Sequence, residues 1–178
     1  MTSSSPDDGF RDAYNRLIAD VTQRYGIPLH VCDVKDPFTG DLDGAEIHVD
    51  YAEDIESALF IVVHLFGHTV QWNISAEYRA LGADLSIGKG EDVLMKILRY
   101  EENATRYSLQ LMHDVGIKDL DQWVSDYFAA DWKYLAHYYR TGEKLDFRKL
   151  IEPGKGALLT PLRIPDFKPQ KWISRWSF

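Results

Sequence analysis

The chain has 178 residues, of which 45% are hydrophobic and 13% aromatic, so it is long and apolar enough to form the core of one domain. This composition excludes a disordered chain. The formal net charge of −8 argues against a general nucleic-acid binder, because a phosphate backbone requires a basic face. Residues 142–178 carry eight Lys and Arg against four Asp and Glu, a net of +4, which leaves −12 on residues 1–141. The basic tail either docks on the acidic body or is solvated.

The N-terminal residues 1–8 are rich in Ser and Asp and have neither a basic nor an apolar region, so we expect disorder there and no signal peptide. The longest apolar run, residues 58–63, is too short to span a bilayer. The single cysteine, Cys32, excludes an intrachain disulfide, and its apolar surroundings predict that it is buried. We therefore expect a cytoplasmic protein that has no membrane partner.

The first predicted elements are a helix over residues 9–25, which ends at Gly26-Ile27-Pro28, and two β-like runs at 29–34 and 45–49. The turn formers of residues 36–41 separate the two runs and predict a hairpin-like pair. The second run alternates between apolar and polar residues, and we interpret His48, on its polar face, as an exposed strand residue.

The rest of the chain is predicted to be mainly helical, with helices over residues 54–72 and 92–113. Residues 73–89 contain Gly82 and Gly88 and predict an irregular crossing with one short helix. Two helical pieces are expected at 119–127 and 128–139, and their aromatic residues are interpreted as core rather than as a ligand cage. Prolines 161, 165 and 169 exclude a helix in residues 154–178, so this segment is predicted to be an extended arm with Trp172, Trp176 and Phe178 as apolar anchors.

These elements predict an α+β fold, mainly helical, with a small N-terminal β-sheet and an extended C-terminal arm. The corresponding division of the chain is a disordered N-terminus (1–8), one domain (9–150) and the Pro-containing arm (151–178).

The residues that indicate chemistry are His64 and His68. Positions i and i+4 of a helix project from one face, so both imidazoles can bind one cation, and zinc accepts neutral imidazole readily. Alone, this spacing is a weak signal, but the helix is apolar nearly all round at residues 59–63 and is therefore central in the fold. Gly67 inside such a helix indicates close packing against another backbone.

The next long helix contains the segment Tyr100-Glu101-Glu102-Asn103-Ala104-Thr105-Arg106-Tyr107. It places a carboxylate on a second helix, where this residue could complete a site of two His and one Glu. Such a set suits zinc, iron or manganese.

The order of these elements resembles the layout of the gluzincin-type, zincin-like peptidases: a short strand, a His-containing helix and then a helix with Glu-x-x-Ala. The closest likeness is to the ImmA/IrrE family. The resemblance covers residues 10–142 and implies zinc as the cofactor, with His64, His68 and Glu101 as its ligands. Asn103 and Thr105 depart from the family pattern, so Glu102 is an alternative ligand or a neighbour of the site. The resemblance also implies a peptide or protein as the partner.

Leu65 is the most important departure from this family, because it occupies the position of the Glu that acts as general base in His-Glu-x-x-His peptidases. Loss of a positioned acid–base group costs about 10²–10⁴-fold in rate. Nothing in the sequence specifically supports another base, such as Glu77 or Asp131. Three hypotheses follow: a zinc peptidase with an altered active site, a non-catalytic peptide- or protein-binding regulatory module on the same fold, and a helical domain with a coincidental His pair. Leu65 favours altered or lost peptidase activity.

Overall fold

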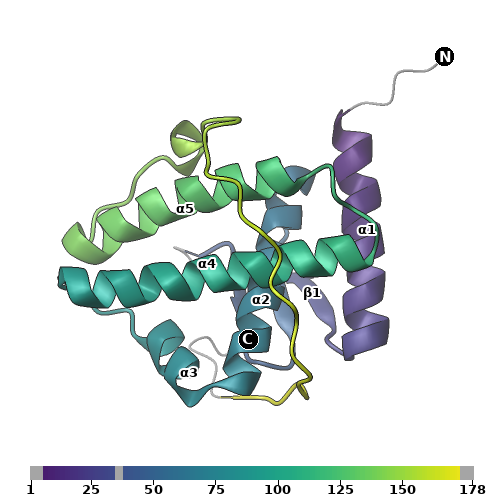
Figure 1. Ribbon diagram of the computed structural model, residues 1–178, viewed down its shortest axis with the longest axis horizontal. Helices are drawn as coiled ribbons and strands as arrows, with labels where there is room; N and C mark the ends of the chain where they lie inside the picture. The colour runs from purple at the N-terminus through teal and green to yellow at the C-terminus, as the bar shows by residue number, and fades with distance from the viewer. Residues whose placement is uncertain (1–5, 35–37, 173–178) are drawn as a thin grey trace.

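The computed structural model describes residues 6–34 and 38–172, and over these residues the fold is α+β and mainly helical, as predicted (Figure 1). The helices are α1 (Pro6–Tyr25), α2 (Ile55–Ile74), α3 (Ala76–Ala83), α4 (Glu91–Asp114), α5 (Asp121–Thr141) and the short 3₁₀ helix η1 (Phe147–Leu150). The strands are β1 (Leu29–Cys32), β2 (Gly40–Leu42) and β3 (Ile47–Asp50). None of the described helices is long and apolar enough to cross a membrane.

Helix α2 is the centre of the fold. It begins after Asp54, whose carboxylate accepts a hydrogen bond from the backbone N–H of Ser57 at 2.8 Å, as an N-cap does. Most of its side chains are buried, and α1, α4 and the sheet pack around it. The apolar pattern therefore predicted its central place correctly, because a helix that is apolar nearly all round requires contacts on every side.

The sheet differs from the predicted hairpin of the 29–34 and 45–49 runs. Its strand order is β1-β3-β2, β1 pairs with β3 in parallel, and the antiparallel partner of β3 is β2. The turn of the β2–β3 hairpin lies at Asp43, whose Oδ1 accepts hydrogen bonds from the N–H groups of Ala45 and Glu46, and at Gly44, whose φ is +97°. The segment between the two predicted runs thus contains a strand of its own, and the chain returns parallel to β1.

Other predictions need smaller corrections. The two helical pieces predicted at 119–127 and 128–139 are one helix, α5, which begins at Asp121, because no Gly or Pro interrupts the segment. Residues 6–8, within the segment expected to be disordered, form the first turn of α1, and residues 1–5 lie outside the described part. The short helix expected in residues 73–89 is α3. Cys32 is only half-buried, and His48 is only 9% exposed rather than solvated.

The C-terminal arm docks on its own domain, which decides between the two expectations for the basic tail. It crosses α4, where the N–H of Leu162 donates to the carbonyl of Arg106 and the guanidinium of Arg106 donates to the carbonyl of Thr160 (Figure 1). At the arm's end the N–H of Trp172 donates to the carbonyl of Asp43 at 2.7 Å. The predicted anchors Trp176 and Phe178 lie outside the described residues. Four apolar side chains of the arm pack on the core: Leu159, Leu162, Ile164 and Phe167.

Candidate metal centre

Helix α2 presents His64 and His68 from the same face, one turn apart, as the spacing predicted. Their Nε2 atoms are 3.0 Å apart and the two rings are perpendicular, so each ring directs the same nitrogen toward a common point. The ring of His64 stacks on Phe60, with centroids 5.3 Å apart, and the ring of His68 lies against Tyr100. Both imidazoles are therefore held by packing.

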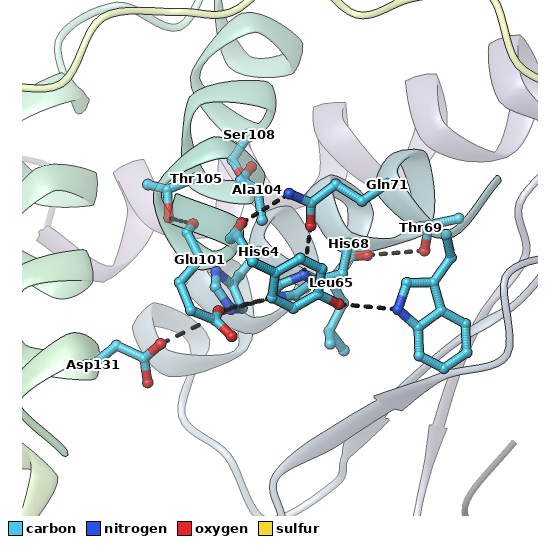
Figure 2. Close-up of polar contacts among 12 residues, drawn as sticks. His64, Leu65, His68, Thr69, Gln71, Glu101, Ala104, Thr105, Ser108 and Asp131 are labelled. Atoms are coloured by element: carbon cyan, nitrogen blue, oxygen red, sulfur yellow. Dashed lines mark hydrogen bonds and ion pairs between the residues drawn. The ribbon is translucent and has the colours of Figure 1, made fainter. Parts of the chain in front are cut away.

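Helix α4 supplies Glu101 to the same point. Its Oε2 lies 2.9 Å from Nε2 of His68 and 3.2 Å from Nε2 of His64. Figure 2 shows the three side chains from the two helices pointing toward one another. The predicted triad is thus brought together by the tertiary structure, whereas Glu102 does not belong to this group of ligand atoms.

The two helices approach closely enough for this contact because residue 67 is a glycine. A Cβ built at Gly67 would lie 2.1 Å from the carbonyl oxygen of Ala104, so α4 occupies the space of the missing side chain. One turn further along α4, the hydroxyl of Ser108 donates to the carbonyl of Val63 at 2.7 Å. The expectation that Gly67 marks close backbone packing is confirmed.

A buried amide orients His68. Nδ1 of His68 lies 2.9 Å from Oε1 of Gln71, and the amide nitrogen of Gln71 donates to the carbonyl of Tyr100 at 2.8 Å (Figure 2). Because that donation directs the amide oxygen of Gln71 at His68, the proton of a neutral His68 belongs on Nδ1. Its Nε2 then carries a lone pair that faces His64 and Glu101, the arrangement that metal-bound histidines have.

The electrostatics of this cluster favour positive charge next to Glu101. Burial alone would raise the pKa of Glu101, which is 6% exposed, but the charge of His68 and the hydrogen bonds from His64 and His68 together lower that pKa below its usual value. When both imidazoles give up the proton on Nε2, these two nitrogens and the carboxylate oxygen are Lewis bases, and they lie 2.9–3.2 Å from one another. Neighbouring ligand atoms of a tetrahedral zinc ion are roughly 3.3 Å apart, so the residues fit such an ion.

Helix α5 adds a second carboxylate, that of Asp131. Its Oδ2 lies 3.9 Å from Nε2 of His64, and the side chain is 19% exposed. Burial raises the pKa of Asp131 to about 7, with a further increase from Glu101 and an opposing effect of His64. Asp131 does not belong to the group of ligand atoms that all lie within 4.8 Å of one another, so it stands beside the triad. The signal in the sequence was a charged residue inside the aromatic stretch of α5.

The triad lies in the wall of a pocket of about 490 Å³. Leu65, at the position that the general base has in the peptidases this sequence resembles, lines this pocket and lies next to β2, where a Cβ at Gly40 would lie 2.8 Å from its Cδ1. It presents only a hydrocarbon surface to the pocket, whereas Asp131 also lines it and Glu77 does not. Of Glu77 and Asp131, only Asp131 therefore lies at the pocket.

Most of the pocket surface is apolar, and much of it is aromatic. Four aromatic residues of α5 that the sequence assigned only to the core also line this space, because the helix packs against α4 with one face and borders the pocket with another: Tyr127, Tyr134, Tyr138 and Tyr139. The aromatic lining residues are Phe38, Phe60, Trp72, Tyr100, Tyr127, Tyr134, Tyr138, Tyr139 and Phe147.

Comparisons with protein-family models, with curated proteins and with solved structures found no match for this chain.

Proposed function

We propose that the protein binds a zinc ion through His64, His68 and Glu101 and acts as a peptidase-like zinc hydrolase with an altered acid–base group. The observation that carries this proposal is the convergence of three Lewis-basic atoms at 2.9–3.2 Å in the wall of a pocket. Three protein ligands, rather than four, are typical of zinc sites that perform catalysis. The resemblance to the ImmA/IrrE family supports zinc over iron or manganese, which the ligand set alone also suits.

When bound, zinc would polarise a substrate carbonyl and lower the pKa of a bound water. The chain's own residues have separate tasks. Glu101 and the neutral imidazoles would hold the ion, and Gln71 would keep the proton of His68 on Nδ1. We assign proton transfer to the carboxylate of Asp131, because it faces the triad from the pocket side and Leu65 can neither accept nor donate a proton.

The proposed substrate is a peptide segment with a large apolar side chain. A pocket of about 490 Å³ lies within the usual range of small-molecule and side-chain sites, and its aromatic walls would bury such a group. The polar groups at the pocket include Ser57 and Arg148, which could hold the peptide backbone or a carboxylate.

A second candidate function is a non-catalytic peptide- or protein-binding regulatory module on the same fold. Leu65 favours it, because the residue removes the family's general base and enlarges the apolar surface of the pocket. In this case the metal site would be structural and Asp131 would have no role in turnover.

Metal content tests the first part of the proposal. We expect the variant with His64→Ala and His68→Ala to lose about one tightly bound zinc per chain relative to wild type, measured by elemental analysis after dialysis against a weak chelator. Glu101→Gln should weaken zinc binding, and Glu102→Gln is the matched control that should leave it unchanged. Equal zinc content in wild type and in the double-His variant would exclude these ligands.

A peptide-library cleavage assay separates the two functions. The hydrolase proposal expects zinc-dependent cleavage by the wild type and a loss of about 10²–10⁴-fold in Asp131→Asn, with zinc retained. Glu77→Gln, a carboxylate outside the pocket, is the control and should keep the wild-type rate. Cleavage that arises only in Leu65→Glu would favour the binding module. Full activity in Asp131→Asn would contradict the role of this carboxylate.

A further inference from the structure

A second group of metal-ligand side chains lies on the face of the sheet that is turned away from the core. Along β3, Ile47 and Val49 are buried in the hydrophobic core, so His48 between them points to the opposite face. His30 of β1 is its direct partner in the parallel register. The two imidazole rings stack with centroids 5.0 Å apart and an interplanar angle of 21°.

Glu46 joins this pair because it lies two residues before His48 and therefore points to the same face. Its Oε2 lies 3.6 Å from Nε2 of His30 and 3.8 Å from Nε2 of His48. The turn at Asp43 fixes its backbone, since Oδ1 of Asp43 accepts a hydrogen bond from the N–H of Glu46 at 2.9 Å. Asp43 is itself held by the ammonium of Lys171 from the arm, at 3.2 Å.

The ligand atoms of these three side chains are too far apart for direct hydrogen bonds and close enough to approach a shared cation. Both N–O separations exceed the 2.7–3.2 Å of a hydrogen bond. They exceed the roughly 3.3 Å between neighbouring ligand atoms of a tetrahedral metal by only a few tenths of an ångström, and the two stacked rings would rotate about their side-chain bonds so that both Nε2 atoms point at the ion. One ligand atom from each residue lies within 4.8 Å of the other two.

We propose that His30, His48 and Glu46 form a second site for a transition-metal ion of the zinc class, separate from the site of the proposed function. Zinc-class ions bind a set of two imidazoles and one carboxylate more readily than magnesium or calcium does, because magnesium and calcium prefer oxygen ligands. His30 is 47% exposed on its side chain, so the remaining coordination positions face solvent and take water or an external ligand. The ion would join the edge strand β1 to β3, and its binding would stabilise the sheet.

The test uses the full chain, without an added polyhistidine tag, in the His64→Ala/His68→Ala background, so that failure of the first site does not affect the outcome. Titration with Zn²⁺ by calorimetry, and with Co²⁺ by visible absorption, should show one ion bound per chain. His30→Ala and Glu46→Gln should each weaken this binding by at least about tenfold. His30 is exposed, so its substitution leaves the core intact. The matched control is His113→Ala, a half-buried histidine that pairs with Asp121, and it should leave binding unchanged.

If the variant with His64→Ala and His68→Ala does not fold, His30→Ala is made in the wild-type chain. Zinc binding by the wild type should then fall from two ions per chain to one in His30→Ala, while the metal-induced shifts of the His48 ring resonances disappear. Absence of zinc binding in the folded double-His background would overturn the proposal, as would binding that His30→Ala does not weaken.

Discussion

Gly67 of α2 lies against the backbone of Ala104 in α4, so closely that a Cβ at residue 67 would come 2.1 Å from the Ala104 carbonyl oxygen. This contact sets the separation of the two helices that hold the ligand triad. One residue after Gly67 is His68, and one turn before Ala104 is Glu101, whose side chains meet at 2.9 Å. The absence of a side chain at Gly67 therefore determines both the packing of the core and the geometry of the candidate metal centre.

Gly67→Ala is expected to destabilise the protein. Alanine in place of glycine gains up to about 1 kcal/mol of helix propensity, but overlap with a backbone atom forces the helices apart, and such overpacking costs about 1–3 kcal/mol or more. Urea denaturation should show a lower free energy of unfolding, and zinc affinity should fall because the distance between His68 and Glu101 increases.

Gly9→Ala is the matched control for this prediction. Gly9 lies within α1, and a Cβ there would meet no atom within 4 Å. The free energy of unfolding should therefore stay constant or rise by up to about 1 kcal/mol. Equal effects of the two substitutions would contradict the steric role of Gly67.

Gln71→Met should weaken zinc binding while the ligand set stays complete. Methionine has a similar length but removes the oxygen that lies 2.9 Å from Nδ1 of His68, so the imidazole loses the group that fixes its tautomer. Loss of such a partner typically costs about 10–100-fold in metal affinity. Chelator competition measures the affinity, and nitrogen NMR of the His68 ring measures the tautomer.

Gln110→Met is the control, because the amide of Gln110 donates to the exposed carboxylate of Asp114 on the same helix. Its zinc affinity should equal that of the wild type. Wild-type affinity in Gln71→Met would show that packing alone orients His68.

Asp126→Asn should loosen the start of the C-terminal arm. The carboxylate accepts hydrogen bonds from the N–H groups of Gly154 and Gly156 and from the amide of Gln122, at 2.6, 2.8 and 2.9 Å. Burial alone would raise the pKa of Asp126, but these hydrogen bonds together lower it. The amide group of asparagine places a donor opposite a donor, so we expect a loss of about 1–3 kcal/mol at pH 7.

The sign of the pH effect follows from the lowered pKa of Asp126. Its contribution to stability is complete above the unfolded-state pKa, about 3.9, and is lost as the pH falls through the folded-state pKa. The difference in unfolding free energy between wild type and Asp126→Asn should therefore shrink below about pH 4. Asp119→Asn, at an exposed position, is the control that should show no such difference. A difference that stays constant with pH would argue against this assignment.

Phe167→Ala should detach the middle of the arm. The Phe167 ring stacks on Tyr25 with centroids 5.7 Å apart and meets Phe66 edge-on. Removal of a half-buried aromatic ring exposes this part of the core, so we expect a loss of about 1–3 kcal/mol and an increase in binding of a hydrophobic dye. Leu158→Ala is the control, because Leu158 is 61% exposed. Unchanged dye binding in Phe167→Ala would mean that the arm contributes nothing to covering the core.

The sequence alone predicted the two long helices of the core and the His pair on one of them. The apolar periodicity of residues 54–72 and 92–113 reflects a helix face that is buried, and both helices are observed as α2 and α4. His64 and His68 share one face of α2 because helix geometry is local. The role of Gly67 could also be predicted locally. Glycine destabilises a helix, so a glycine inside one indicates that a neighbouring backbone occupies the space of a side chain.

Only the tertiary structure decided which distant groups meet. The parallel pairing of β1 and β3 depends on the path of the chain between them, which residue patterns do not specify, and it is this pairing that places His30 beside His48. Asp131 reaches His64 because α5 packs on α4, and nothing local to α5 indicates that contact. Local periodicity records which face of an element is buried, whereas the partner of that face is set by packing between elements far apart in the chain. The sequence therefore identified the His pair, and the fold brought Glu101 and Asp131 to it.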